Sequence, residues 1–257
     1  MLSCLYHIDK MKTELIYLEQ TDSTNRYLRE NHLSSLIDED KMVVVWTGYQ
    51  TAGKGQGSNV WESERDENLL FSVLVHPVSV PVNKQFVLSM AIALAVKKTL
   101  DTYTDDITVK WPNDVYWRDN KISGTLIETT ITSHGIRDCV FGTGIDINQK
   151  EFHCTATNPI SLYGILGKET DPKCVLDDVV EKLKEYMTLI NKGDYRDIRD
   201  EYMSSLYRSQ GLFPYRDSEG PFRASIEDVE DDGHLLLRDT DHKIRRYAFK
   251  EVKYIIE

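Results

Sequence analysis

Short apolar stretches bounded by turn residues recur through the first third of the chain, and their length favours strands. Three of them are "ELIYL" (Glu14–Leu18), "MVVVWT" (Met42–Thr47) and "NLLFSVLVHP" (Asn68–Pro77). The second is β-branched and unbroken, which is typical of a buried strand. Pro77 ends the third, because proline cannot donate to a sheet hydrogen bond. The pattern therefore predicts three sheet strands in this part of the chain.

Two longer segments have the spacing of helices. "NKQFVLSMAIALAVKKTL" (Asn83–Leu100) is apolar almost all round, which predicts a largely buried helix. A second, amphipathic helix is indicated by apolar residues that recur every three or four positions: Val175, Val179, Leu183, Met187 and Ile190. We also expect a short helix at "DSTNRYLREN", where Asp, Ser and Thr are good N-caps, and a polar helix that ends near Tyr207.

Strand patterns return around and after these helices. "ITVKW", "VYW" and "KISGTLIETTI" predict strands, with a hairpin turn at "RDN", and "CVFGTGIDIN" (Cys139–Asn148) predicts another. From residue 211 onward, short strands are separated by Asp-Gly and Thr-Asp-His turns. The sequence thus predicts an α+β fold in three parts: an N-terminal extension at 1–12, a catalytic domain at 13–210 and a small β domain at 211–257.

Charge and cysteine usage narrow the class of protein. The 257 residues include 31 Lys and Arg against 42 Asp and Glu, a net charge of −11, which disfavours a nucleic-acid binder. The four cysteines (Cys4, Cys139, Cys154 and Cys174) form no CxxC pair, so we expect reduced thiols and no zinc site. With no apolar run near the roughly 18 residues that span a bilayer and no signal peptide, we expect a cytoplasmic protein that does not enter a membrane. Met11 is a possible alternative start.

A glycine-rich loop follows the second strand. "GYQTAGK" (Gly48–Lys54) matches part of a P-loop, but Gly55 stands where that motif needs Ser or Thr, and further glycines oppose the required helix. Two interpretations of the loop at Gly48–Asn59 stay open: an anion site made by backbone N–H groups with Lys54, and a flexible surface loop. Trp61, just beyond it, is either a core residue or a stacking platform.

The stretch "KWPNDVYWRDNK" (Lys110–Lys121) places polar groups where two strands end. Pro112 stops strand pairing after Lys110, and the turn brings Lys121 back to the same end of the sheet. Gly124 permits a close approach to the backbone, and Glu128 lies on the same strand. We therefore expect both lysines, Asn113 and Asp114 around one pocket; the alternative is a hairpin with solvated charges.

At this point the residues resemble a family. "KWPNDVYWRDNKISGTLIE" is similar to the biotin–protein ligase signature, and three further pieces agree in order: "DSTN" (Asp22–Asn25), "QTAGKGQGSNVW" (Gln50–Trp61) and "GTGIDIN" (Gly142–Asn148). The resemblance covers residues 14–150, and the tail resembles the family's small SH3-like barrel. It implies a mixed sheet flanked by helices, of the class II synthetase-like, biotin/lipoyl ligase type.

The resemblance also implies a reaction. Such ligases join biotin to ATP, release pyrophosphate, and pass biotin from biotinoyl-AMP to a lysine of a biotin carboxyl carrier domain. Bringing a carboxylate to about 4 Å from a phosphate charge costs roughly 4 kcal/mol at an effective dielectric constant of 20, so fixed cations are required. Lys121 and Lys54 are the expected cations, Asp114 is expected to orient the acceptor lysine, and Mg²⁺ is expected to accompany ATP. No residue of the protein is singled out by the sequence as a metal ligand.

The same resemblance assigns the remaining site residues. Expected to bind biotin are Ser23, Thr24, Asn25, Gln50, Gly53, Lys54, Gly55, Gln56, Lys121 and Gly124. Expected to bind the nucleotide are Lys54, Gln56, Asn59, Trp61, Lys110, Asn113, Asp146 and Asn148. Paired hydroxyl and amide groups suit the ureido ring of biotin, which offers two donors and one acceptor. Ser23 and Thr24 are alternatively no more than helix N-caps.

Some positions depart from the family pattern. Gln56 stands where the family has a second loop arginine, and Asp146 where it has asparagine; an Asp can accept from adenine N6, as Asn does, but cannot donate to a ring nitrogen. "DSTN" begins at residue 22, so we expect no N-terminal DNA-binding domain and no repressor role.

A lipoate– or octanoate–protein ligase and a non-catalytic biotin-binding regulator are the alternatives. The carrier stays open, as does the choice between monomer and homodimer.

Overall fold

The computed structural model describes residues 11–33, 38, 40–57, 59–133, 135–153 and 158–256. Most of the expected N-terminal extension, with Cys4, lies outside these residues, as does Cys154. The elements are β1 (Lys12–Leu18), α1 (Thr24–Asn31), β2 (Lys41–Thr47), β3 (Leu69–Val75), η1 (Val82–Lys84), α2 (Phe86–Leu100), β4 (Ile107–Lys110), β5 (Asp114–Trp117), β6 (Asn120–Thr132), β7 (Gly135–Ile145), α3 (Leu162–Leu166), α4 (Pro172–Lys192), α5 (Tyr195–Ser204), β8 (Phe213–Asp217), β9 (Gly220–Val229), β10 (Leu235–Asp239), β11 (Ile244–Tyr247) and β12 (Lys253–Tyr254).

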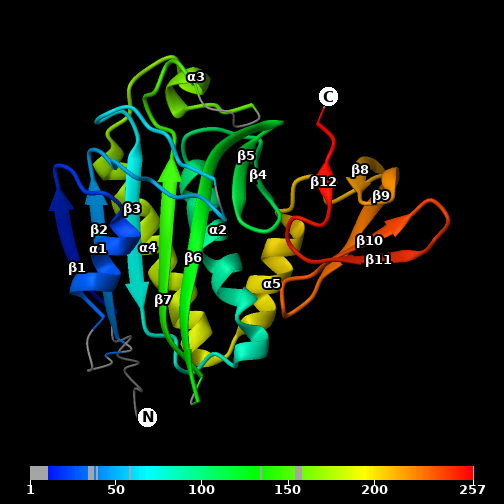
Figure 1. Ribbon diagram of the computed structural model, residues 1–257, viewed down its shortest axis with the longest axis horizontal. Coiled ribbons are helices and arrows are strands. Elements are labelled where there is room, and N and C mark those ends of the chain that lie inside the picture. The colour runs from blue at the N-terminus through cyan, green and yellow to red at the C-terminus, as the bar shows by residue number, and fades with distance from the viewer. Residues whose placement is uncertain are drawn as a thin grey trace, which may run out of the picture.

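The larger unit is built on a seven-stranded sheet with the order β1-β2-β3-β7-β6-β5-β4 (Figure 1). β1 and β2 are parallel, and the other neighbouring strands run antiparallel. Every residue of β3 is buried, which fits its unbroken apolar sequence at the centre of the sheet. The mixed sheet therefore brings the ends of β2, β6 and β7 together, although these strands are far apart in sequence.

Helices cover both faces of this sheet. Leu28 of α1 packs on Val43 and Val45 of β2, forming a small core on one face. α2 and α4 lie behind the other face in Figure 1 and share the main core with it. The five apolar residues predicted to line one side of α4 are all buried, which confirms the amphipathic helix. The predicted buried helix at Asn83–Leu100 also forms, but α2 begins at Phe86, after the 3₁₀ turn η1.

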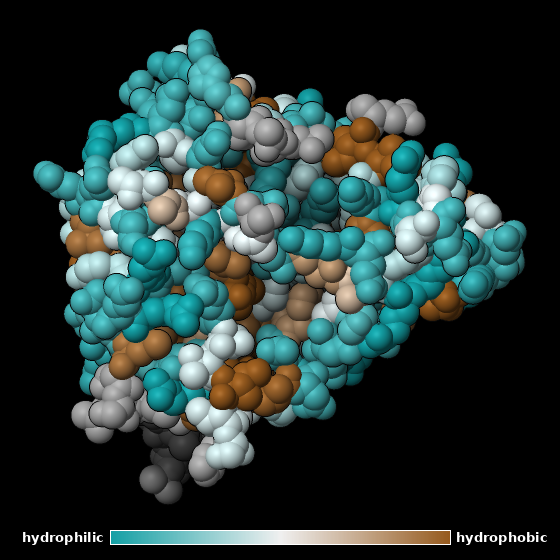
Figure 2. All heavy atoms as spheres, viewed as in Figure 1, coloured by the Kyte–Doolittle hydropathy of each residue, from teal (hydrophilic) through white to brown (hydrophobic). Residues whose placement is uncertain are grey.

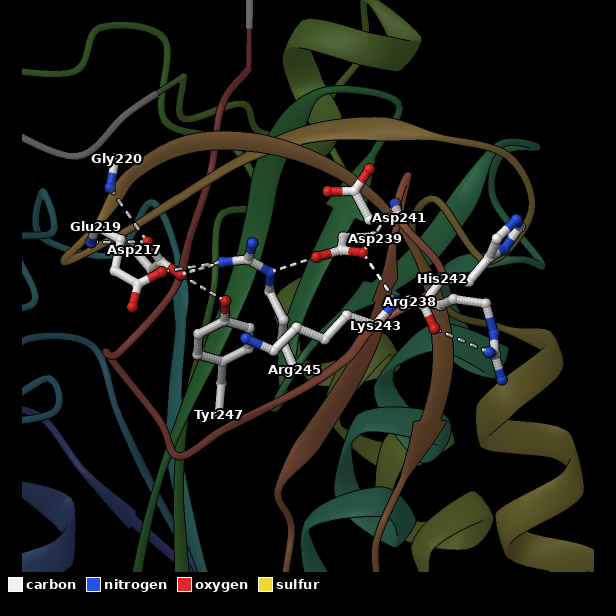
Figure 3. Close-up of polar contacts among 10 residues, drawn as sticks. All are labelled: Asp217, Glu219, Gly220, Arg238, Asp239, Asp241, His242, Lys243, Arg245 and Tyr247. Carbon is white, nitrogen blue, oxygen red and sulfur yellow. Dashed lines mark hydrogen bonds and ion pairs between the residues drawn. The ribbon is translucent and has the colours of Figure 1, made fainter.

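The C-terminal strands form a separate five-stranded sheet with the order β11-β10-β9-β8-β12. Figure 3 shows Arg245 reaching between two of its turns: Nε donates to Asp239 (2.9 Å) and Nη1 to Asp217 (3.2 Å). Tyr247 adds a hydrogen bond from its hydroxyl to Asp217 (2.6 Å). These contacts lower the pKa of both carboxyl groups, mainly through the hydrogen bond from Tyr247 at Asp217 and that from Arg245 at Asp239. The network ties together turns that a small apolar core alone would leave loosely held.

The two units meet at the segment that follows β4. The indole of Trp111 donates a hydrogen bond to the carbonyl oxygen of Gly233 (3.0 Å), and its ring lies 5.9 Å from that of Phe249. In Figure 1 the C-terminal strands accordingly lie beside β4 and β5, away from β1. The segment that follows Lys110 therefore links the large sheet to the C-terminal unit.

The α+β class is confirmed, with a mixed sheet flanked by helices and a C-terminal antiparallel sheet. The domain boundaries inferred from the sequence stay a prediction. The five-residue helix α3 was not predicted, since its sequence is short and contains a glycine. Among the described residues, no helix is long and apolar enough to cross a membrane.

Candidate functional site

A cavity of about 790 Å³ lies where the sheet, the glycine-rich loop and the C-terminal segment meet. Figure 2 shows a recess on this face of the molecule, between the surface of the large unit and that of the C-terminal strands. The predicted residues that line the cavity are Ser23, Thr24, Asn25, Gln50, Lys54, Gly55, Gln56, Asn59, Trp61, Lys110, Asn113, Asp114, Lys121, Gly124 and Asp146. Segments from residue 23 to residue 146 thus converge on one hollow.

The glycine-rich loop is joined to the segment before α1 by backbone hydrogen bonds. Thr51 donates to the carbonyl of Thr21 and Ala52 to that of Asp22, both at 2.9 Å. Lys54 forms an isolated bridge with Val60, and no helix follows the loop in the described residues up to β3. The loop therefore lacks the strand–loop–helix form of a P-loop, and it covers the cavity instead.

A connected set of polar side chains forms one wall. The backbone N–H of Thr24 donates to Gln50 Oε1 (2.8 Å), and Ser72 Oγ lies 2.7 Å from Thr24 Oγ1 and 2.6 Å from Asn25 Oδ1. Asn25 Nδ2 in turn donates to Glu128 (2.8 Å). Thr24, Asn25 and Ser72 are buried, so their polar groups must be paired or face a ligand.

The Ser23 side chain is not a helix cap. Ser23 occupies the N-cap position of α1, but its hydroxyl accepts no hydrogen bond from the helix. The side chain of Asp22 instead accepts from the backbone N–H of Ser23 (2.6 Å). The hydroxyl of Ser23 lines the cavity, so the alternative that this serine serves only as a cap does not describe the structure.

Two glycines of β7 make room for side chains of the wall. A Cβ atom on Gly142 would lie 2.1 Å from Asn25 Oδ1, and one on Gly144 would lie 2.3 Å from the indole of Trp61. Real Cβ contacts are never this short, so any larger residue would displace these groups. The indole of Trp61 therefore packs directly on the strand, and its Nε1 has no hydrogen-bond partner among the described residues.

The expected pair of lysines and the Asn-Asp segment do meet in one pocket. Lys121 Nζ donates to Asp114 Oδ1 at 2.7 Å, and both side chains are partly exposed to the cavity. Gly124 lies beneath this pair, because a Cβ there would be 2.9 Å from Lys121 Nζ. Without a ligand, the charge of Lys121 is thus balanced by Asp114.

Lys110 lies deeper, among aromatic rings. Its ammonium donates to the hydroxyl of Tyr116 (2.9 Å) and lies 5.3 Å from the ring centre of Tyr254. Burial lowers the pKa of Lys110, and Lys121 and Arg208 lower it further, while Asp114 opposes the shift. A cation held against rings in this way can face an anionic ligand with little rearrangement.

Asp146 differs from the expectation based on an ionised carboxylate. It is buried, with 4% of its surface exposed, and burial raises the pKa of its carboxyl group well above the usual range, with Lys121 opposing the shift. A neutral carboxylic acid carries one O–H donor as well as acceptor oxygens. In that neutral form Asp146 could both donate and accept, as an asparagine does.

Two predicted residues do not reach the cavity surface. Asn148 exchanges hydrogen bonds of 2.9 Å with the backbone N–H and carbonyl of Thr170, so its side chain fastens the segment before α4. Gly53 lies against the carbonyl of Trp61, where a Cβ would be 2.5 Å away. Both support the site from outside rather than lining it.

Several residues that line the cavity were not predicted from the sequence: Glu62, Phe71, Tyr116, Thr125, Leu126, Thr143, Phe152, Pro159, Phe249, Tyr254, Ile255 and Ile256. Tyr116 lies within the "KWPNDVYW" motif, two residues after Asp114 on the same strand, and the two-residue period of a strand could have placed it on the face of Asp114. Phe249 and Tyr254 come from the C-terminal unit, and no local pattern in the sequence connects them to the cavity.

One group of side chains elsewhere has the spacing of metal ligands among the described residues: Glu230, Asp232 and His234. Arg246 forms ion pairs with Glu230 (2.6 Å) and Asp232 (2.7 Å). The guanidinium already balances these carboxylates, so the cluster is explained as an ion-pair network of the C-terminal sheet.

Comparisons with known proteins agree with this geometry. The sequence profile of the Biotin/lipoate A/B protein ligase family matches residues 17–146. The bifunctional ligase/repressor BirA of Bacillus subtilis is 27% identical over 259 residues, covering 95% of this chain and 74% of that protein. Biotin–protein ligase 2 of Arabidopsis thaliana is 33% identical over 209 residues, covering 75% of this chain and 61% of that protein.

Solved structures show the same similarity. The biotin protein ligase of Aquifex aeolicus, in complex with biotin and ATP, superposes with a TM-score of 0.76 at 25% identity, covering 94% of this chain and 99% of that one. The match extends over both the large sheet and the C-terminal strands.

Proposed function

The chain belongs to the biotin/lipoate A/B protein ligase family, and on that premise we propose that it is a biotin–protein ligase. It uses ATP to convert biotin to biotinoyl-5′-AMP and then transfers the biotinoyl group to a carrier lysine. The observation that supports this most directly is the single cavity, which places the polar wall around Thr24 and Gln50 in the same hollow as Lys54, Lys110 and Lys121. One wall suits the ureido ring and the three cations suit carboxylate and phosphate groups.

In the first step, a carboxylate oxygen of biotin attacks the α-phosphorus of ATP, and the bond to pyrophosphate breaks. Lys121 is the proposed bridge between the carboxylate and the α-phosphate. Its ammonium is paired with Asp114 at 2.7 Å. An arriving anion competes for that ammonium, so the positive charge becomes available when the substrates need it. Lys54, on the loop that covers the cavity, offsets the same charge from the opposite side.

In the second step, the amine of the acceptor lysine attacks the carbonyl carbon of biotinoyl-AMP and AMP leaves. Asp114 is the proposed orienting group. Once Lys121 has turned toward the phosphate, the Asp114 carboxylate is free to accept a hydrogen bond from the incoming amine. The same two side chains would thus act in both steps with their pairing exchanged.

Magnesium, which neutralises charge on the polyphosphate of ATP, fits the donor types of the cavity. Carboxyl oxygens are its preferred protein ligands, and those on the cavity surface belong to Glu62, Asp114 and Asp146. Asp114 is assigned to the acceptor amine, and burial of Asp146 disfavours the charged form of its carboxyl group. Glu62 is therefore the candidate residue for contact with the ion.

We further propose that the partner is the biotin carboxyl carrier domain of a biotin-dependent carboxylase or decarboxylase, and that the reaction takes place in the cytoplasm. The absence of nucleic-acid binding and the choice between monomer and homodimer stay predictions from the sequence.

Pyrophosphate release on mixing the protein with ATP and biotin tests this function. Parallel reactions with lipoate and octanoate distinguish the related ligases, and a reaction without any acid measures background hydrolysis. We expect pyrophosphate release from ATP with biotin, but not with lipoate or octanoate. When a carrier domain is added, we expect biotin to be incorporated into it. Release with lipoate but not biotin would overturn the assignment, and biotin binding without pyrophosphate release would indicate a non-catalytic regulator.

A further inference from the structure

The polar wall continues behind the cavity and ends at a residue that does not line it. Asn25 Nδ2 donates to Glu128 Oε2 at 2.8 Å, and Arg29 donates to Glu128 Oε1 at 2.7 Å. Glu128, on β6, borders a smaller recess of about 360 Å³ on the other side of Asn25. A line of hydrogen-bonding groups therefore runs from the cavity through Thr24, Ser72 and Asn25 to Glu128.

The hydrogens along this line can be placed in one direction. A carboxylate only accepts, so Asn25 must turn Nδ2 toward Glu128 and Oδ1 toward Ser72. Ser72 Oγ lies 2.6 Å from that oxygen and has a single hydrogen, which must be given to it. The contact of 2.7 Å between Ser72 Oγ and Thr24 Oγ1 then takes the hydrogen of Thr24, because it is shorter than the alternative contact of Thr24 Oγ1 with Gln50 Oε1 at 3.1 Å.

This direction decides what the cavity offers to a ligand. With its own hydrogen given to Ser72, the Thr24 hydroxyl has only lone pairs left. Gln50 Oε1 already accepts from the backbone N–H of Thr24 at 2.8 Å, so the Gln50 amide has its Nε2 group left as a donor. The wall therefore presents one acceptor and one donor side by side, which matches an N–H and a neighbouring carbonyl on one edge of a cyclic urea.

We propose that Glu128 is a positioning residue that fixes the direction of this hydrogen-bond line, so that Thr24 accepts from an N–H group of the biotin ureido ring. The inference rests on the proposed function and names the group that sets its specificity for biotin. The geometry supports a directed line because Gly142 leaves Asn25 in close contact with β7, and Asn25 is 5% exposed. Its amide is held in a buried site where unpaired groups are costly.

The first test replaces the carboxylate by an amide of the same shape. Glu128→Gln can offer either an oxygen or an N–H₂ group to Asn25, so the direction of the line is no longer fixed. We expect the dissociation constant for biotin, measured by calorimetry, to rise about tenfold, which corresponds to one lost or mismatched hydrogen bond. The KM for ATP should change by less than about twofold, because the line does not reach the nucleotide side.

The matched control is Arg29→Met, which removes the ion pair with Glu128 but leaves the hydrogen bond to Asn25. We expect its biotin affinity to stay within about twofold of the natural protein, because an exposed ion pair contributes little. A loss equal to that of Glu128→Gln would overturn the inference, since the effect would then belong to the ion pair.

A double variant tests the direction itself. In Asn25→Asp combined with Glu128→Gln, the amide at position 128 donates to the carboxylate at position 25, which still accepts from Ser72. The direction is restored and the net charge is unchanged, so we expect biotin affinity to return to within about threefold of the natural protein. This result would also show that the single variant had not lost affinity through misfolding.

Two further results contradict the inference. Biotin binding by Glu128→Gln within about twofold of the natural protein would do so, as would a double variant no tighter than the single one. Either leaves the proposed function standing, because the natural protein would still bind biotin and release pyrophosphate. Failure of the natural protein to bind biotin would overturn the proposed function and this inference together.

Discussion

Gly142 of β7 lies so close beneath Asn25 of α1 that a methyl group on the glycine would come within 2.1 Å of the amide oxygen. The pair shows how a strand and a helix far apart in sequence are fitted together at the cavity. Because Asn25 is bound to both Ser72 and Glu128, moving it breaks contacts on both sides.

We therefore expect Gly142→Ala to weaken biotin binding by at least about tenfold and to lower the free energy of unfolding by roughly 1–3 kcal/mol, the usual cost of overpacking. The matched control is Gly164→Ala in α3, where a Cβ meets nothing closer than 3.4 Å. Titration with biotin and urea denaturation measure the two effects. If the two variants had equal biotin affinity and an equal free energy of unfolding, Asn25 would be able to move without cost.

Lys121→Ala should nearly abolish formation of biotinoyl-AMP while the fold survives. Its side chain is partly exposed to the cavity. Loss of one charge-stabilising contact in an enclosed site typically costs about a hundredfold in rate. Pyrophosphate release measures this loss, with circular dichroism as the control for folding. Turnover close to that of the natural protein would remove Lys121 from the mechanism.

Asp146→Asn should stabilise the protein at neutral and alkaline pH. Burial raises the pKa of the Asp146 carboxyl in the folded state above its unfolded value, so the folded protein binds this proton more tightly. The resulting stability is present below the unfolded pKa of about 3.9 and is lost as the pH rises toward the folded pKa. Asparagine has no such loss, and each unit of difference in pKa is worth about 1.4 kcal/mol.

Urea denaturation of the natural protein and of Asp146→Asn at pH 4 and pH 8 checks the direction of this pH dependence. The advantage of Asp146→Asn should be small at pH 4 and larger at pH 8. An advantage of equal size at both values would mean that Asp146 does not titrate differently in the folded and unfolded states.

Gln56→Arg should slow the release of biotinoyl-AMP. A charged hydrogen bond contributes about 1.5–3 kcal/mol and a neutral one about 0.5–1.5 kcal/mol, so a gain near 1 kcal/mol predicts roughly fivefold slower dissociation. Arg65 does not supply this charge, because it is bound to Gln20 (2.5 Å) and lies over the ring of Tyr49. Lys250 does lie near the loop, with Nζ 3.4 Å from the Gln56 carbonyl oxygen.

The dissociation rate is measured by chasing preformed biotinoyl-AMP from each protein. Lys250→Met is a useful companion: if Lys250 already supplies the missing charge, this variant should release the adenylate faster than the natural protein. An arginine variant that releases as fast as the natural protein would show that Gln56 is a neutral replacement.

The parts of the site that could be predicted from sequence lie close together along the chain. Lys110, Asn113, Asp114 and Lys121 belong to the consecutive antiparallel strands β4, β5 and β6, so the two turns that join these strands are enough to bring them to one pocket. The amphipathic pattern of α4 likewise depends only on neighbours three or four residues apart.

The parts that could not be predicted depend on packing between distant segments. Nothing near Asn148 in the sequence indicates its pairing with Thr170, and the low exposure that raises the pKa of Asp146 is a property of the folded surroundings. Glu128 was placed on the strand of Gly124, but its contact with Asn25 spans 103 positions. Such contacts appear only when the sheet and α1 are assembled.

The last turns of the chain have a consequence for the order of synthesis. Phe249, Tyr254, Ile255 and Ile256 line the same cavity as Ser23 and Thr24, so its walls come from segments that are far apart in the chain. A ribosome releases the segments around Ser23 and Lys121 long before these four residues. The large sheet is therefore synthesised before this wall of the cavity exists. The cavity can be enclosed on that side only after β12 and the residues that follow it have been made.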